Sequence, residues 1–342
     1  MIFEAPGRAR WHEVDEPRLP SDAAAIVEPV AVATCDLDAG FMRGEAEMFG
    51  TGFSVGHEAV ARVVETGEGV RERRPGDVVV VPFQISCGSC RWCAVGLTAH
   101  CELLPGSPAY GMGPLCGDYD GMLADRFVVP YADHMLVPVP SGAPPQAVAS
   151  ASDNLSDAHH AVSAGLQRAP AADVLIVGGR AASIGLYAIQ LALALGAASV
   201  TYTDREGSRL ERAERLGARP LPWPGEDRAG RFAVTIDASG SQRGLRLALR
   251  SVDHDGVCVN VAMPFRDTTL PVFDMYMDGV TFLTGRNSAR THIPAVLDLV
   301  HRGAIDPTPV TDRVVGWDDA EGALADPPDK LVILGPDATV QP

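Results

Sequence analysis

Lysine is almost absent from this chain. Lys330 is the only one among 28 lysine and arginine residues, and the acidic residues number 44, which gives a net charge of -16. Such a charge repels phosphate backbones and anionic lipid, so nucleic acids and membrane surfaces are not expected partners. We attribute the use of arginine to genome composition rather than to binding. A small molecule is the expected partner.

Long apolar runs and internal repeats are also missing. No segment approaches the roughly 20 apolar residues that a membrane helix needs. The stretch MIFEAPGRARWHEVDEP has acids and prolines where a secretion signal has a basic end and an apolar core. We therefore expect a cytoplasmic, globular protein. Its 342 residues are enough for two domains.

The pattern of apolar residues changes near Asp173. Before it, short runs bounded by turn residues predict a β-rich half, as in AAAIVEPVAVAT, EAVARVVETG, DVVVVPF and DRFVVP. After it, strand-like and helical segments alternate, as in DVLIVGG, SIGLYAIQLALALGA, SVTYTD and SRLERAERLGA. This alternation is typical of a parallel sheet with a nucleotide crevice at its strand ends. The tail predicts a helix in IPAVLDLVHRGAIDP and a final strand in KLVILG.

Four of the 7 cysteines stand close together in CGSCRWCAVGLTAHC, at Cys87, Cys90, Cys93 and Cys101. Four thiolates at C-x2-C-x2-C-x7-C spacing are able to surround one tetrahedral zinc, and such a closed site is structural. Two disulfides or an iron-sulfur cluster are the alternatives. Disulfides conflict with the expected cytoplasmic location. We therefore predict a structural zinc.

Several dispersed motifs occur together in a specific order. They are Cys35 with Asp38, the Gly56-His57-Glu58 tripeptide, the four-cysteine lobe, Pro75-Gly76-Asp77 before a strand, the strand-turn-helix at DVLIV, and IDASG. In this combination the chain resembles the zinc-dependent medium-chain dehydrogenase/reductase family, the alcohol dehydrogenases. The resemblance implies an α/β fold with a GroES-like catalytic domain and a Rossmann coenzyme domain. It places the first at residues 1–154 and 288–342, with the zinc lobe at 86–102, and the second at 155–287.

The resemblance also implies roles for individual residues. Cys35, His57 and Asp153 would bind a catalytic zinc, and a carboxylate is an acceptable zinc ligand. Asp38 would hold the second ring nitrogen of His57. Glu58 would be the acid that enters the metal's coordination transiently, and Phe83 would line the substrate pocket. The alternatives are a helix cap for Asp153, a salt bridge for Glu58 and a core position for Phe83.

The predicted coenzyme loop is GGRAASIG. It departs from G-x-G-x-x-G and is closer to the spacing of the family's quinone reductase branch, with Gly179, Ala182 and Gly185. Asp204 follows nineteen residues after Gly185, where an acid would bind the adenosine ribose and favour NAD over NADP. The adjacent Arg205 leaves NADP open. The candidate coenzyme residues are Gly178, Gly179, Ala182, Ser183, Ile184, Gly185, Asp204 and Arg205.

The implied reaction is hydride transfer between an alcohol and NAD, with zinc activating the oxygen. The hydroxyl and histidine that pass the proton to solvent in much of the family are replaced here by Leu37 and Gly40, which carry no proton. Asp157 and His160 share a helical face with Asp153 and are a hypothetical substitute route. The alternatives are a reductase of C=C or C=N bonds and a catalytically silent zinc- and nucleotide-binding protein.

The substrate and the assembly are less defined. Acids around the site favour polyols, sugars or amino-alcohols. The loop YGMGPLCGDYDG would form pocket walls, and Cys116 within it is expected to be a small buried residue. From the family we expect a dimer or tetramer, with its seam near GVTFLTG.

Overall fold

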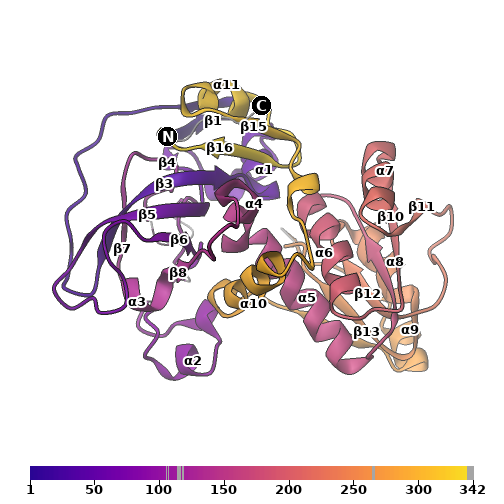
Figure 1. Ribbon diagram of the computed structural model, residues 1–342. Coiled ribbons are helices and arrows are strands. Elements are labelled where there is room, and N and C mark those ends of the chain that lie inside the picture. The colour runs from indigo at the N-terminus through magenta and orange to yellow at the C-terminus, as the bar shows by residue number, and fades with distance from the viewer. Residues whose placement is uncertain (105, 107, 114–116, 118, 264–265, 337–342) are drawn as a thin grey trace. The chain divides into compact units, whose positions relative to one another are not determined.

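The computed structural model describes residues 1–342 except 105, 107, 114–116, 118, 264–265 and 337–342, so Cys116 lies outside the described residues. The chain divides into two compact units (Figure 1). The first comprises Met1–Ser156, Ser288–Gly303 and Thr311–Pro342, and the second comprises Asp157–Asn287 and Ala304–Val310.

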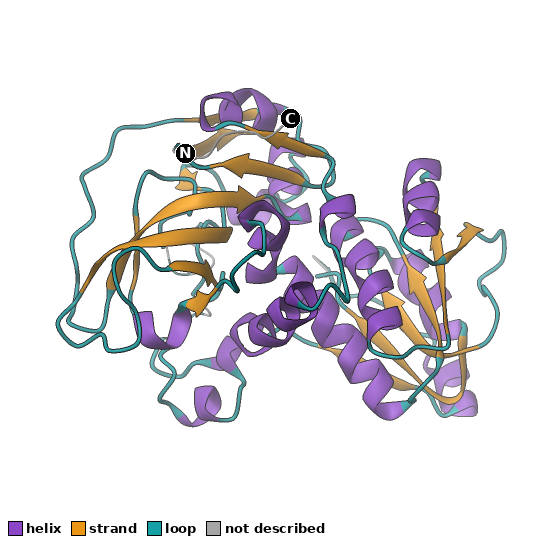
Figure 2. Ribbon diagram, in the orientation of Figure 1, coloured by secondary structure: helices purple, strands orange, loops and turns teal. Residues whose placement is uncertain are grey.

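The first unit is rich in β-strands, as the sequence predicts (Figure 2). One sheet has the order β2-β1-β4, and a 7-stranded sheet has the order β15-β16-β3-β5-β6-β8 with β7 paired to β3. The strands are β1 (Ile2–Ala5), β2 (Arg8–Arg10), β3 (Ala25–Ala33), β4 (Phe53–Ser54), β5 (Glu58–Thr66), β6 (Val78–Val81), β7 (Phe127–Val129), β8 (Val137–Pro138), β15 (Arg313–Val315) and β16 (Leu331–Leu334). Strand β3 pairs antiparallel with β5 and β16, which brings the ends of distant segments together.

Short helices connect the strands of the first unit. They are α1 (Asp36–Arg43), α2 (Arg91–Ala94), α3 (Ala132–Met135), α4 (Pro145–Val148), α10 (Ala289–His301), α11 (Ala320–Ala325) and the 3-10 helices η1 (Glu47–Phe49), η2 (Thr98–His100), η4 (Ala149–Ser152) and η6 (Trp317–Asp319). Phe41 of α1 packs on Phe3 and Phe53, at ring-centroid distances of 5.8 and 5.3 Å. A buried aromatic ring of this kind contributes about 1.5–3 kcal/mol. This contact fixes α1, and with it Cys35 at its start.

The second unit is a doubly wound parallel sheet of the order β11-β10-β9-β12-β13-β14, which confirms the predicted alternation. Its strands are β9 (Asp173–Val177), β10 (Ser199–Asp204), β11 (Arg219–Pro222), β12 (Phe232–Asp237), β13 (Val252–Asn260) and β14 (Thr281–Thr284). Its helices are α6 (Ala182–Ala194), α7 (Gly207–Arg215), α8 (Gln242–Arg250), α9 (Val272–Asp278) and η5 (Thr308–Val310), and α5 (Asn154–Arg168) enters it from the first unit. From β9 the sheet is built first outward through β10 and β11, and then in the opposite direction through β12, β13 and β14. The order of strands therefore reverses between β9 and β12. That switch point is where such sheets bind ligands.

Helix α8 shows why these segments fold as they do. The Ser241 side chain caps the helix by accepting a hydrogen bond from the Gly244 N–H at 3.0 Å. Leu245 and Leu249 lie in a buried cluster with Leu175 of β9 and Cys258 of β13. Among the described residues, no helix combines the length and apolar character needed to cross a membrane.

Candidate metal and coenzyme sites

Cys35 is the N-cap of helix α1. Its Sγ atom accepts a hydrogen bond from the Leu37 N–H at 3.1 Å, and Oδ2 of Asp38 accepts one from the Cys35 N–H at 2.8 Å. The sulfur therefore lies at the positive end of the helix dipole, which partly offsets the effect of burial and of the nearby carboxylates on the thiol. The reciprocal capping also fixes the Asp38 carboxylate, leaving its second oxygen for another partner.

The structure brings Cys35, His57 and Asp153 together. Their candidate ligand atoms all lie within 4.8 Å of one another, and all three residues are buried. His57 precedes β5, and Asp153 follows η4 directly before α5. Nε2 of His57 lies 3.6 Å from Oδ2 of Asp153, and Nδ1 of His57 lies 3.7 Å from Oδ1 of Asp38. Asp38 thus lies beside the ring nitrogen that is turned away from Asp153.

The donor set fits a zinc ion. Two ligand atoms bonded to zinc at about 2.1 Å lie roughly 3.4 Å apart in a tetrahedron, close to the His57–Asp153 distance. Both ring nitrogens of His57 and Oδ1 of Asp38 are buried without a hydrogen-bond partner. Buried polar atoms are rarely left unpaired, and this arrangement of unpaired donor atoms suits the binding of a cation.

The electrostatics favour a cation in the same place. Burial alone would lower the pKa of His57, but Asp38 and Asp153 raise it to about 9. Burial raises the pKa of the Cys35 thiol well above its usual value, and Asp153 and Asp38 raise it further. The acids around the site thus favour a positive charge between them, which protons on His57 and Cys35 supply in the absence of metal. A bound metal ion would supply that charge instead and displace these protons.

Glu58 is held away from solvent by several partners. Its Oε2 accepts hydrogen bonds from Nζ of Lys330 at 2.5 Å and from the Ser150 hydroxyl at 3.1 Å, and its Oε1 accepts one from the Asn154 N–H at 2.8 Å. The side chains of both Glu58 and Lys330 have no exposed area. No sequence motif points to this partner, although Lys330 is the only lysine of the chain.

Phe83 lies beside the cluster. Its ring centroid is 6.1 Å from that of His57, and the residue is buried. Leu37 and Gly40 lie on α1, and neither supplies a polar side chain. Asp157 and His160 lie on α5 in the second unit. Burial lowers the pKa of His160, so its ring is neutral at pH 7.

The four cysteines of the lobe form a second cluster. The sulfurs of Cys87, Cys90, Cys93 and Cys101 lie within 4.8 Å of one another. The Cys87 and Cys93 sulfurs are 3.9 Å apart, far longer than a disulfide bond and close to the roughly 3.8 Å between two sulfurs bound to one tetrahedral zinc. The Cys87 sulfur accepts hydrogen bonds from the N–H groups of Ser89 and Cys90. These donors stabilise a thiolate that binds metal.

The predicted coenzyme loop connects β9 to α6. A Cβ atom on Gly178 would lie 2.2 Å from the Tyr202 hydroxyl, and one on Gly179 would lie 2.6 Å from the Ser239 carbonyl oxygen. Gly179 has a φ of 156°. Ala182 begins α6, Ser183 and Ile184 follow in its first turn, and Gly185 allows the helix to approach Ala238. The glycines of this loop are therefore required by contacts within the protein.

Asp204 ends β10 and is buried. Its Oδ1 accepts hydrogen bonds from the N–H groups of Arg205 and Glu206, and its Oδ2 accepts one from the Tyr202 hydroxyl. The Arg205 guanidinium lies over the Trp223 ring, 4.6 Å from its centroid. The acid thus stands at the strand end where the sequence predicts it, with part of its hydrogen-bonding capacity already used.

Two family models match the chain. The one described as the alcohol dehydrogenase GroES-like domain matches residues 21–141, and the one described as zinc-binding dehydrogenase matches residues 183–302. Together with the parallel sheet they confirm the expected fold class.

Whole-chain comparisons agree with these matches. A probable zinc-binding alcohol dehydrogenase of Mycobacterium tuberculosis is 29% identical over 95% of this chain and 84% of its own. The zinc-type alcohol dehydrogenase B of Aspergillus flavus is 30% identical over 88% of this chain and 72% of its own. The solved alcohol dehydrogenase of Thermus sp. ATN1 has a TM-score of 0.88 at 29% identity, and the match covers 97% of this chain and 98% of that one.

Proposed function

The chain belongs to the zinc-dependent medium-chain dehydrogenase/reductase family, the alcohol dehydrogenases, and on this premise we propose that it transfers a hydride between an alcohol carbon and NAD. The observation that carries the proposal is the buried cluster of Cys35, His57 and Asp153. Three protein ligands leave the fourth position of a tetrahedral ion for a substrate, which distinguishes a catalytic site from a closed one.

Zinc bound by these three residues would lower the pKa of an alcohol oxygen and, in the reverse direction, polarise a carbonyl. The chain's own residues prepare the site. Asp38, whose Oδ1 lies 3.7 Å from Nδ1 of His57, would orient the His57 ring, and the cap on α1 fixes both Cys35 and Asp38. Phe83 contributes an apolar wall beside His57, where a substrate carbon would lie.

The alcohol proton needs a route that avoids Leu37 and Gly40. We propose that water, or Asp157 and His160, accepts it. The lowered pKa of His160 makes its ring a neutral acceptor at pH 7. Single replacement of Asp157 and His160 tests this route, because a lost acceptor shifts the profile of turnover against pH. Profiles identical to the wild type would leave water as the carrier.

We propose two zinc ions per chain, one catalytic and one in the four-cysteine lobe, with NAD preferred to NADP because of Asp204. Glu58 is proposed to approach the catalytic metal only when it leaves Lys330. The first unit would be the catalytic domain and the second the coenzyme domain. Polyols, sugars and amino-alcohols are the favoured substrates, since Asp36, Asp38 and Asp153 surround the site.

The assembly and the location are part of the same proposal. Helix α9 exposes Phe273 and Tyr276 at 76% and 82%, next in the chain to the edge strand β14. An open sheet edge beside exposed aromatic rings is suited to pairing with a second copy. We propose a dimer or tetramer with this seam, in the cytoplasm.

The decisive experiment combines a metal count with a substrate panel. Purified wild type should contain two zinc ions and the His57→Ala variant one. Alcohols of the classes above should give NADH absorbance with NAD and a weaker signal with NADP. Because Leu37 and Gly40 remove the usual relay, C=C and C=N acceptors are assayed with NADH in parallel. Turnover of these acceptors alone would identify a reductase, and one zinc without turnover would identify a silent protein.

A further inference from the structure

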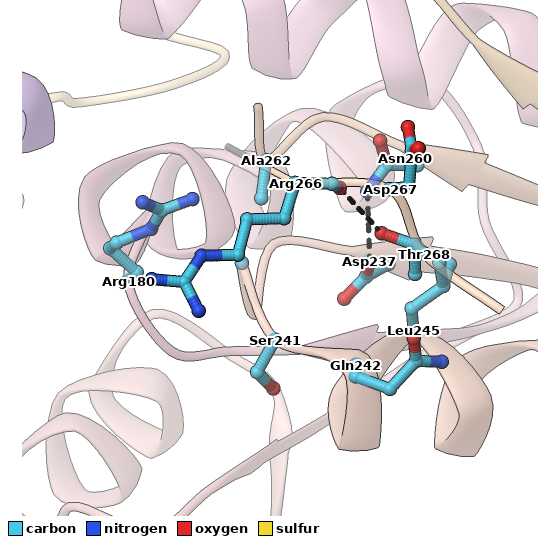
Figure 3. A pocket seen from close by; sticks show the side chains of 11 residues that line it. Arg180, Asp237, Ser241, Gln242, Leu245, Asn260, Ala262, Arg266, Asp267 and Thr268 are labelled. Atoms are coloured by element: carbon cyan, nitrogen blue, oxygen red, sulfur yellow. Dashed lines mark hydrogen bonds between the residues drawn. The ribbon is translucent and has the colours of Figure 1, made fainter. Parts of the chain in front are cut away.

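A pocket of about 330 Å³ lies at the carboxyl ends of β12 and β13, within the second unit (Figure 3). Arg180 and Arg266 line it from one side, and Asn260, Asp267 and Thr268 line it from another. Open α/β sheets bind ligands at the carboxyl ends of their strands. Two guanidinium groups in such a pocket select an anion.

Counted back from Gly185, the G-x-G-x-x-G fingerprint would place a glycine where this chain has Arg180. The absence of a side chain at Gly240 leaves room for the Arg180 side chain, because a Cβ atom on Gly240 would lie 2.6 Å from Nε of Arg180. Gly240 has a φ of 61°, a conformation that glycine adopts without strain. The guanidinium donates a hydrogen bond to the Met263 carbonyl oxygen at 2.5 Å, which orients it across the strand ends.

The backbone of the loop is already engaged. The Arg180 and Ala181 N–H groups donate to the carbonyl oxygens of Ser239 and Ala238, both at 3.0 Å. The Gly178 N–H donates to the Thr203 carbonyl oxygen at 2.8 Å. In a glycine-rich phosphate loop, the backbone N–H groups of the loop and of the first turn of the following helix receive the anion. Here these three amides hold β9, β10 and β12 together instead.

The acidic residues of the pocket do not neutralise the positive charge of both arginines. Asp237 is buried, and its carboxylate accepts hydrogen bonds from the Ser239 N–H and the Asn260 side-chain amide. Asp237 therefore forms part of the buried base of the pocket, and its carboxylate already has hydrogen-bond donors. Asp267 is exposed, and no carboxylate of the described residues lies within ion-pair distance of Arg266. A guanidinium in this state is available to a ligand.

We propose that Arg180 and Arg266 bind the diphosphate of the dinucleotide coenzyme through their side chains, in place of the backbone amides of Gly178, Arg180 and Ala181. This inference rests on the proposed use of a nicotinamide dinucleotide. It explains why arginine replaces the glycine at residue 180, and why the glycines nearby serve packing within the protein. The negative charge of Asp267 would repel the diphosphate and lower the affinity of the pocket for it.

The test measures binding rather than turnover. ADP-ribose, which carries the diphosphate without nicotinamide, is titrated into the zinc-loaded protein by calorimetry, with adenosine as the probe that lacks phosphate. Arg180→Gln and Arg266→Gln should each weaken ADP-ribose binding about tenfold, equivalent to about 1.4 kcal/mol, and leave adenosine unchanged. Asp267→Asn should tighten ADP-ribose binding. Arg243→Gln, which removes an exposed arginine of α8 outside the pocket, should bind as the wild type does.

The outcomes separate this inference from the proposed function. Wild-type affinity for ADP-ribose in both arginine variants would overturn the pocket assignment and leave the dehydrogenase proposal intact. An equal loss of ADP-ribose affinity in Arg243→Gln would also overturn the pocket assignment. The loss would then come from the change in net charge of the protein and not from a contact in the pocket. A wild type that binds neither NAD, NADP nor ADP-ribose would contradict both. Thermal unfolding shows whether Arg180→Gln is folded, and Arg266→Gln alters only an exposed side chain.

Discussion

Nζ of Lys330 lies 2.5 Å from Oε2 of Glu58, and neither side chain has any exposed area. The pair joins the start of β5, next to His57, to the residue before β16. Burial raises the pKa of Glu58, Lys330 lowers it, and the result is about 7. Each charge is retained in the interior only because the other is present.

Replacement of Lys330 by Met should therefore destabilise the fold. Removing one partner of a buried ion pair leaves an uncompensated charge and costs about 3–5 kcal/mol. Denaturant unfolding at pH 8 measures the loss. Because the folded-state pKa of Glu58 would rise further above its unfolded value of 4.5, the variant should regain stability as the pH falls toward that value. Lys330→Arg, which keeps the charge, is the control, and equal losses in both variants would contradict the account.

Zinc binding at the catalytic cluster should release protons. At pH 7 the metal-free site holds a thiol on Cys35, whose pKa is raised well above 9, and an imidazolium on His57, whose pKa is about 9. Both must lose a proton to bind the ion, so about two protons should be released. Calorimetry in buffers of different ionisation enthalpy counts them, and the difference between wild type and His57→Ala isolates this site from the cysteine lobe. A difference near zero would contradict the assigned ligands.

Replacement of Asp204 by Ala should reduce the preference for NAD. In the proposed role the carboxylate would bind ribose hydroxyls and repel a 2'-phosphate, so its loss should raise the KM for NAD about tenfold, as expected for a charged hydrogen bond, and lower the KM for NADP. The substitution also removes the acceptor for the Arg205 and Glu206 N–H groups. Tyr202→Phe, which removes only the hydroxyl that donates to Asp204, is the matched control. Unchanged selectivity in Asp204→Ala would count against the assignment.

Polar substitution on α9 should dissociate the proposed seam. Phe273 and Tyr276 are exposed in the chain, so Phe273→Asp and Tyr276→Asp should leave the fold stable and yield a monomer. Sedimentation gives the mass, and thermal unfolding of the isolated variant gives the stability. Leu195→Asp, on the partly exposed C-cap of α6, is a control that should not change the mass. An unaltered assembly in the α9 variants would place the seam elsewhere.

The sequence predicts those parts of the molecule that depend on local patterns. Alternating strands and helices after Asp173 specify the parallel sheet, because apolar periodicity is a local property. The C-x2-C spacing brings the lobe cysteines together for the same reason. In contrast, helix α9 has apolar residues on its exposed surface and no buried residue, and the sequence did not predict it.

Side-chain contacts between distant segments are harder to predict. Only the family resemblance predicts that Cys35, His57 and Asp153 lie together, since their spacing carries no periodic signal. The contact of Glu58 with Lys330 spans 272 positions and depends on the pairing of β16 with β3. The need for glycine at residue 240 follows from the Arg180 side chain, which packs beside it in the folded chain. Such contacts follow from the packed fold rather than from local sequence.

The burial of Lys330 has a consequence for reactivity. With the single lysine inaccessible, every basic side chain that this protein presents to solvent is a guanidinium or an imidazole. Amine-directed chemistry such as acetylation, or Schiff-base formation with aldehydes, then finds no surface lysine to attack. Wherever reactive carbonyl compounds accumulate, the side chains of the folded chain are spared lysine adducts and lysine cross-links, and unfolding would expose one such target.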